Sequence, residues 1–110
     1  MNTRDYMNYI VDTSVDSIEL AEEIGEVFDK LCWITMDNGS EIQRVRETWL
    51  KSQDYARIKI SLNMNSIYPF LNRVEMEDVL QRIMNLYPDL SELCNKLIEE
   101  RKKLNEPLDN

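Results

Sequence analysis

The 110-residue chain has no histidine and contains two cysteines, two glycines and three prolines. Without histidine, Ser-His and Cys-His nucleophile pairs and histidine-ligated zinc are excluded. Cys32 and Cys94 lie too far apart in the sequence for a zinc motif, and we expect both to be buried as small apolar residues. Any catalysis would therefore need carboxylates, lysine or tyrosine, together with a hard metal ion.

The scarcity of glycine and proline predicts long regular elements with few tight turns. No uninterrupted apolar run reaches the length of about 18 residues that a membrane span needs, so we expect no membrane association. The first residues lack the basic and then apolar order of a secretory signal, which favours a cytoplasmic location. With 43% hydrophobic and 31% charged residues, the composition is typical of one globular domain over residues 1–110.

Acidic residues are concentrated in the first third of the chain. Residues 1–39 contain nine acidic and two basic side chains, whereas residues 40–60 contain three acidic and five basic ones. The net charge of −8 disfavours direct nucleic-acid binding, which needs clustered lysine and arginine. It favours a basic protein surface as partner, or pairing of the basic middle segment with the acidic segment, within one chain or across a dimer.

The first strong helical pattern begins near Thr13 or Ser14, either of which can cap a helix. Its apolar positions follow the helical period and are Leu20, Ile24, Val27, Phe28, Leu31 and Ile34. The acidic positions on the opposite side are Glu19, Glu22, Glu26 and Asp29, with Glu23 at the border. Gly25 within this helix predicts the close approach of another backbone or of a ligand.

The dipeptide Asn38-Gly39 has two interpretations. It can end one helix, in which case Ser40 and Gln43 form a capping box for the next. It is also a strong hairpin turn, and residues 32–36 are rich in β-forming side chains. We favour two helices joined by a turn, because the following apolar residues keep helical spacing at Ile42, Val45 and Trp49.

Residues 57–64 alternate apolar and polar side chains, which predicts a short strand. The last third has a second helical stripe that ends at Pro88, and Asp89 then opens a further helix. We expect residues 1–12 to be an N-terminal arm and residues 105–110 a frayed tail. The predicted fold is mainly α, a compact bundle of three to four helices with a short β element within residues 32–64.

Two acidic motifs stand in separate segments. The first is EExxE, at Glu22, Glu23 and Glu26, and the second is ExxD, at Glu75 and Asp78. This pair resembles the signature of the MazG-like, all-α nucleotide pyrophosphohydrolases. The resemblance implies that these five carboxylates hold Mg²⁺ between two helices, where the metal bridges a nucleoside triphosphate and activates a water.

We favour a different function, that of a small acidic protein-interaction module without enzymatic activity or cofactor. It would be a regulator, adaptor or inhibitor of the kind that phages and mobile elements encode. The residues that would contact a basic partner surface are Glu19, Glu22, Glu26 and Asp29. The bases near Trp49 are interleaved with aromatic residues, as in single-strand nucleic-acid binders, but Trp49 continues an apolar stripe and we expect it in the core.

A third hypothesis is a structural subunit that assembles as a homo-oligomer. Tyr6 and Tyr9 in the N-terminal arm are candidates for docking on a neighbouring copy. Met76 and Met84, at helical spacing, offer an adaptable apolar face, although methionine in such a pattern is more often core.

Overall fold

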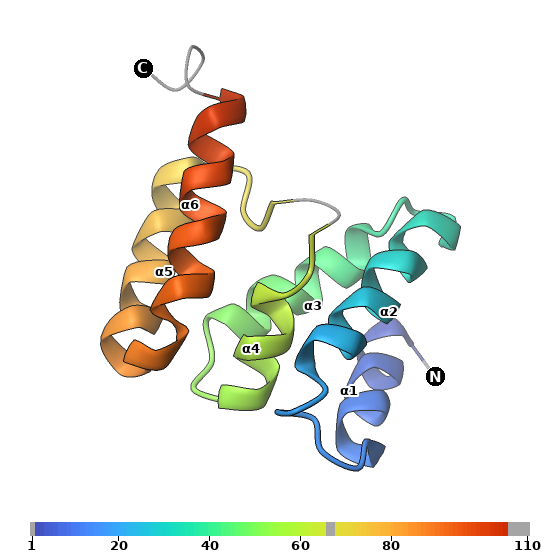
Figure 1. Ribbon diagram of the computed structural model, residues 1–110. Helices are drawn as coiled ribbons and strands as arrows, with labels where there is room; N and C mark the ends of the chain where they lie inside the picture. Colours follow the sequence, from blue (N-terminus) through green and yellow to red (C-terminus); the bar gives the residue numbers. More distant parts are fainter. Residues whose placement is uncertain (1, 66–67, 106–110) are drawn as a thin grey trace. The chain divides into compact units, whose positions relative to one another are not determined.

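The computed structural model describes residues 2–65 and 68–105, which form six α-helices and one 3-10 helix (Figure 1). In chain order these are α1 (Thr3–Thr13), α2 (Ala21–Ile34), α3 (Ser40–Leu50), α4 (Tyr55–Leu62), α5 (Arg73–Leu86), η1 (Pro88–Leu90) and α6 (Ser91–Asn105). The mainly α fold is confirmed. The expected count of three to four helices is too low, and the described residues contain no strand. Of the expected tail at residues 105–110, the part after Asn105 lies outside the described residues.

The helices belong to two compact units. Unit 1 is Met1–Ile67 with α1 to α4, and unit 2 is Tyr68–Asn110 with α5, η1 and α6. In unit 1, α2 and α3 both pack against α4 and against each other, and α1 contacts both of them. In unit 2, α5 packs against α6, and η1 contacts both. The division into two units does not test the prediction that residues 1–110 form a single domain, which stays a prediction.

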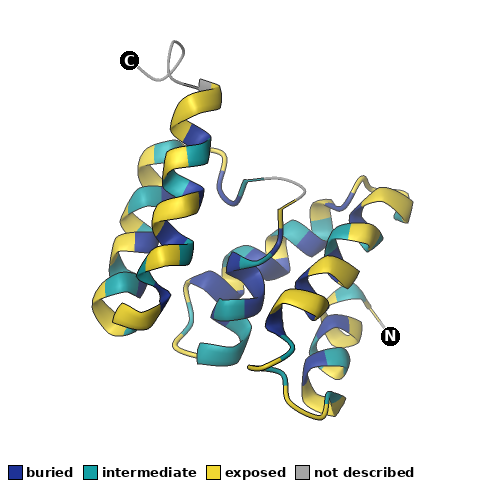
Figure 2. Cartoon of the chain, in the orientation of Figure 1, coloured by how far each residue is buried: buried dark blue, intermediate teal, exposed yellow. Residues whose placement is uncertain are grey.

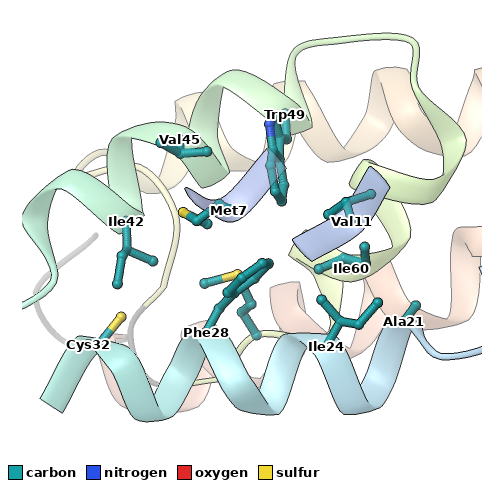
Figure 3. Packing of buried hydrophobic residues seen from close by; sticks show 11 residues of the cluster. Met7, Val11, Ala21, Ile24, Phe28, Cys32, Ile42, Val45, Trp49 and Ile60 are labelled. Carbon is teal, nitrogen blue, oxygen red and sulfur yellow. The ribbon is translucent and has the colours of Figure 1, made fainter. Parts of the chain in front are cut away.

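The core of unit 1 lies between α2 and α3. Phe28 and Cys32 point from α2 toward apolar residues of α3, and Ile24 lies near Ile60 of α4 (Figure 3). Met7 and Val11 of α1 belong to the same cluster. The Phe28 and Trp49 rings meet at a centroid distance of 5.9 Å with their planes tilted by 59°. Aromatic pairs prefer such tilted contacts, and this one stabilises the packing of α2 against α3.

The segment expected as an N-terminal arm is helix α1. Asn2 caps it, because its Oδ1 accepts a hydrogen bond of 2.8 Å from the Asp5 backbone N–H. Met7 and Val11 are one turn apart and both are buried in the core. Residues 3–13 are therefore part of unit 1 and not a free extension, although Tyr6 and Tyr9 on the same helix remain exposed.

Helix α2 begins later than the sequence predicts. The Thr13 and Ser14 hydroxyls donate to the carbonyls of Tyr9 and Ile10, so they close α1 and do not cap α2. Asp16 instead organises a turn before α2, since its Oδ1 accepts a 3.1 Å hydrogen bond from the backbone N–H of Glu19.

The turn between α2 and α3 confirms the helix–turn–helix interpretation over the hairpin. Gly39 lies in the left-handed region at φ +79° and directly precedes α3. The expected capping box of Ser40 and Gln43 is wrong. Asp37 does the capping, because its two carboxylate oxygens accept the backbone N–H groups of Gly39 and Glu41. The hydrogen bond from Glu41 is the main reason that the pKa of Asp37 is lowered.

Replacing Gly39 with alanine is expected to lower the stability of unit 1 by at least about 1–2 kcal/mol, the usual cost of a side chain in the left-handed region. The new Cβ would also lie 2.8 Å from the Cβ of Cys32, which is too close. Urea denaturation followed by circular dichroism measures the loss. Asn38 also has a positive φ, of 57°, so Asn38→Gly is the matched control and should not destabilise the protein. Equal stability of Gly39→Ala and the original chain would contradict the strain argument.

The strand expected at residues 57–64 is wrong, because Tyr55–Leu62 is helix α4. Asp54 caps this helix by accepting the Arg57 backbone N–H at 3.1 Å, and no strand among the described residues is available as a pairing partner. Ile58, Ile60 and Leu62 are all buried. A helix that is buried on several sides has apolar residues around its circumference and no single apolar stripe. In α4 these residues fall at every second position, which is the pattern expected of a strand.

Gly25 permits the close packing of α2 against α4. A Cβ on this residue would lie 3.2 Å from the backbone carbonyl and the Cβ of Asn63, the residue that follows α4. The close backbone approach predicted at Gly25 is therefore confirmed, and the neighbour is the chain itself.

In unit 2 the expected end of a helix at Pro88 is confirmed, since α5 ends at Leu86 and η1 (Pro88–Leu90) leads into α6. The segment before α5 contains Phe70 at φ +65°, an uncommon conformation for a residue with a side chain. Arg101 of α6 stabilises it. Its guanidinium donates to the carbonyl oxygens of Pro69 (3.2 Å), Phe70 (2.9 Å) and Leu71 (2.8 Å).

Candidate functional site

The exposed side of α2 carries a group of glutamates that we call the acidic surface, namely Glu22, Glu23 and Glu26. All three are exposed, and Figure 2 shows the exposed side of α2 opposite its buried one. The border position expected for Glu23 therefore does not bury it. Glu22 and Glu23 lie in the first turn of α2, where the positive end of the helix dipole favours negative charge.

Two of the predicted partner-binding residues, Glu19 and Asp29, do not belong to the acidic surface. Glu19 is exposed, but it precedes α2 and lies in the turn that Asp16 caps. Asp29 is half-buried, and its carboxylate accepts the backbone N–H of Asn65 at 2.9 and 3.1 Å. These hydrogen bonds hold the segment after α4, and the charge of Asp29 also interacts with that of Arg46. The structure thus places Glu22, Glu23 and Glu26 together on the exposed side of α2. Asp29 differs from them because its carboxylate is hydrogen-bonded within the chain.

Two arginines of the middle segment, Arg44 and Arg57, have ion-pair partners away from the acidic surface. Arg44 pairs with Glu41 at 2.8 Å, and Arg57 pairs with Asp12 at 2.8 Å and with Asp54 at 3.0 Å. The predicted pairing of the basic segment with the acidic helix is therefore wrong for these two arginines within the chain, because their partners are Glu41, Asp12 and Asp54.

Arg46 is fully buried in unit 1. Its Nε donates to the carbonyl oxygen of Ser61 at 2.9 Å, and its Nη2 donates to that of Met64 at 2.6 Å. Burial lowers the pKa of Arg46 to about 10, and the nearby negative charge of Asp29 opposes this shift. At neutral pH the guanidinium stays charged, and it serves structure and not ligand binding.

Trp49 is buried, as expected for a core residue. Its ring packs against Phe28 on one side, and the Arg57 guanidinium lies 5.5 Å from its centroid. The ring therefore has no open face of the kind that stacks on nucleic-acid bases.

The five carboxylates of the metal-site hypothesis are divided between the units. Glu22, Glu23 and Glu26 lie on α2 of unit 1, and Glu75 and Asp78 lie on α5 of unit 2. In the part of the chain that the structure describes, no three aspartate, glutamate or cysteine side chains converge as metal ligands would. Mg²⁺ binding and pyrophosphohydrolase activity stay predictions, and release of pyrophosphate from a nucleoside triphosphate with Mg²⁺ would be their direct test.

Both cysteines are buried, as expected, and neither forms a disulfide. Burial raises the pKa of the Cys94 thiol to about 11, so this thiol stays protonated at neutral pH and is a poor nucleophile.

Met76 is also fully buried, which removes it from the assembly face proposed for Met76 and Met84.

Among residues 2–65 and 68–105, no helix has the length and apolar character needed to cross a membrane.

Sequence reasoning missed a group of exposed apolar residues at and beyond the C-terminal half of α2. We call it the apolar patch, and its members are Val27, Trp33, Ile34 and Met36. Val27 and Ile34 were assigned to the core stripe. Their positions around the helix carried the signal, because at about 100° per residue both lie well to one side of the line through Ile24 and Phe28.

Comparison with known proteins adds no relative to this description. No family model, no curated protein and no solved structure matches the chain.

Proposed function

We propose that this protein is a non-enzymatic interaction module that binds a basic protein surface through the acidic surface of α2. The observation that carries the proposal is the state of Glu22, Glu23 and Glu26. They are exposed on one side of a helix, while Arg44 and Arg57 pair with other carboxylates. Three neighbouring carboxylates with Lys30 as the only base on the same helix produce a local negative potential that attracts and orients a positive partner.

The proposal suits a regulator, adaptor or inhibitor better than an enzyme. The acidic surface has no histidine and no reactive thiol beside it, because the chain lacks histidine and both cysteines are buried. A convex helix surface also differs from the concave pockets that usually enclose small substrates. Its charge disfavours nucleic acid as the direct partner, since phosphates and carboxylates repel each other.

Reversing the charge of the acidic surface is expected to abolish capture of the partner. The variant Glu22→Lys, Glu23→Lys, Glu26→Lys is compared with the original chain as bait in a lysate of the native host, and bound proteins are identified by mass spectrometry. Because Glu22 and Glu23 lie in the first turn of α2, their reversal should lower stability by about 1–2 kcal/mol, and a thermal melt shows that the variant still folds. A partner that binds both baits equally would contradict the proposal.

The matched control makes the same change in total charge on unit 2. Asp78, Glu92 and Glu99 are exposed, and their replacement by lysine leaves α2 unchanged. This control should keep the partner. If both triple variants lose it, the net charge of the chain, and not the acidic surface, is responsible.

A further inference from the structure

The acidic surface is continuous with the apolar patch along one helix. Trp33 is 77% exposed, Ile34 76% and Val27 47%, and Met36 just after the helix is fully exposed. Single exposed apolar residues are ordinary, but adjacent large ones that include tryptophan mark interaction sites, because such residues dominate the binding energy of interfaces.

These side chains form two parallel rows on α2. At about 100° per residue, Glu22, Glu26 and Trp33 lie within about 40° of one another around the helix. The second row contains Glu23, Val27 and Ile34, again within about 40°. Each row is acidic toward the N-terminal end and apolar toward the C-terminal end. From Glu22 to Trp33 the rows extend about 16 Å at 1.5 Å per residue.

We propose that this side of α2 binds a basic amphipathic helix of a partner protein. Lysine or arginine side chains of that helix would face Glu22, Glu23 and Glu26. Its apolar residues would pack on Trp33 and Ile34. Rows of about 16 Å match about three turns of a helix, which is the usual length of a helical recognition segment. This inference rests on the proposed function and adds the kind of partner and the anchoring residue.

Charge complementarity selects this occupant over a second copy of the chain. Helix α2 has three glutamates on these rows, and Lys30 is its only base. Two copies packed through this side would bring their carboxylates close together or place them against apolar residues, and either arrangement is unfavourable without neutralising bases. The net charge of −8 adds to the repulsion. A basic helix removes the problem, because it covers the carboxylates and the apolar patch together.

The test measures binding of a labelled 18-residue peptide of leucine and lysine, with the leucines at helical spacing, by fluorescence anisotropy. A peptide of the same composition in scrambled order and a peptide with glutamate in place of lysine are the ligand controls. The full chain should bind the first peptide most tightly. Trp33→Ala should weaken this binding by at least about 10-fold, because a tryptophan anchor is lost.

The protein controls separate the charged and apolar contributions. Glu22→Gln with Glu26→Gln should also weaken binding, and the loss should shrink at high salt, whereas the loss from Trp33→Ala should persist. Val15 is 97% exposed in unit 1 but outside α2, so Val15→Ala should bind as the original chain does. Because all these residues are exposed, unchanged melting temperatures are expected and confirm that the variants fold.

Each contrary result has its own meaning. Failure of the leucine-lysine peptide to bind, or equal affinity of Trp33→Ala and the original chain for it, would overturn this inference. The proposed function would then still be tested by the lysate experiment. If the glutamine substitutions also changed nothing, that result would count against both. Self-association in sedimentation velocity that Trp33→Ala abolishes would identify a second copy as the occupant and overturn the inference.

Discussion

Replacing Arg46 with methionine is expected to destabilise unit 1 by about 3–5 kcal/mol. The guanidinium is fully buried and donates hydrogen bonds to the carbonyl oxygens of Ser61 and Met64. Methionine fills a similar volume but donates no hydrogen bond. The substitution would therefore leave buried carbonyl groups short of donors and remove the positive charge near Asp29. Such a loss is large beside the total stability of a small domain, which is about 5–15 kcal/mol.

Urea denaturation followed by tryptophan fluorescence measures this loss in unit 1, because Trp33 and Trp49 both lie there. The matched control is Arg44→Met on the same helix. The Arg44 side chain is 73% exposed and pairs with Glu41 at the surface, so its loss should cost no more than about 1 kcal/mol. If Arg46→Met were as stable as the original chain, apolar packing would replace the buried hydrogen bonds, and our account of Arg46 would be wrong.

Phe28→Ala is expected to cost about 3–5 kcal/mol, the usual range for removing a buried phenylalanine. Phe28 is fully buried at the centre of the cluster and contacts the ring of Trp49 (Figure 3). The substitution removes apolar burial, leaves a cavity between α2 and α3, and deletes the aromatic contact. The near-ultraviolet circular dichroism of Trp49 should weaken, because its ring loses a fixed neighbour.

The neighbouring Val27 provides the control for this substitution. Val27 is 47% exposed and lies about 100° from Phe28 around α2, and alanine has the higher helix propensity. Val27→Ala should therefore change stability by less than about 1 kcal/mol. Equal losses for the two variants would contradict the orientation of α2 in the structure.

Some features of the fold follow from local sequence. Helix α5 and its end before Pro88 are predictable, because a regular apolar stripe and a proline act within a few residues. The turn at Gly39 is predictable for the same reason, since only its own backbone conformation matters. Asp37 was missed as the cap, although an aspartate two residues before the turn glycine is a local signal for it.

Other features depend on contacts between distant residues. Helix α4 looks like a strand because its neighbours in unit 1 bury several of its sides. Arg46 follows Ile42 by one helical turn and so lies on the buried side of α3. Its burial is acceptable only because α4 and the segment after it present the carbonyl groups of Ser61 and Met64 at the right place. Sequence alone indicates the position of Arg46 on the helix but not the acceptors that it meets.

For the candidate site, the sequence by itself determined that α2 has an acidic side and that histidine chemistry is absent. Only the tertiary structure decided which carboxylates remain for a partner, because pairing depends on distances across the fold. It assigned Asp29 to the segment after α4 and left Glu22, Glu23 and Glu26 exposed. It also decided that Trp33 and Ile34 face outward, since α1, α3 and α4 pack against α2 and leave these two side chains exposed.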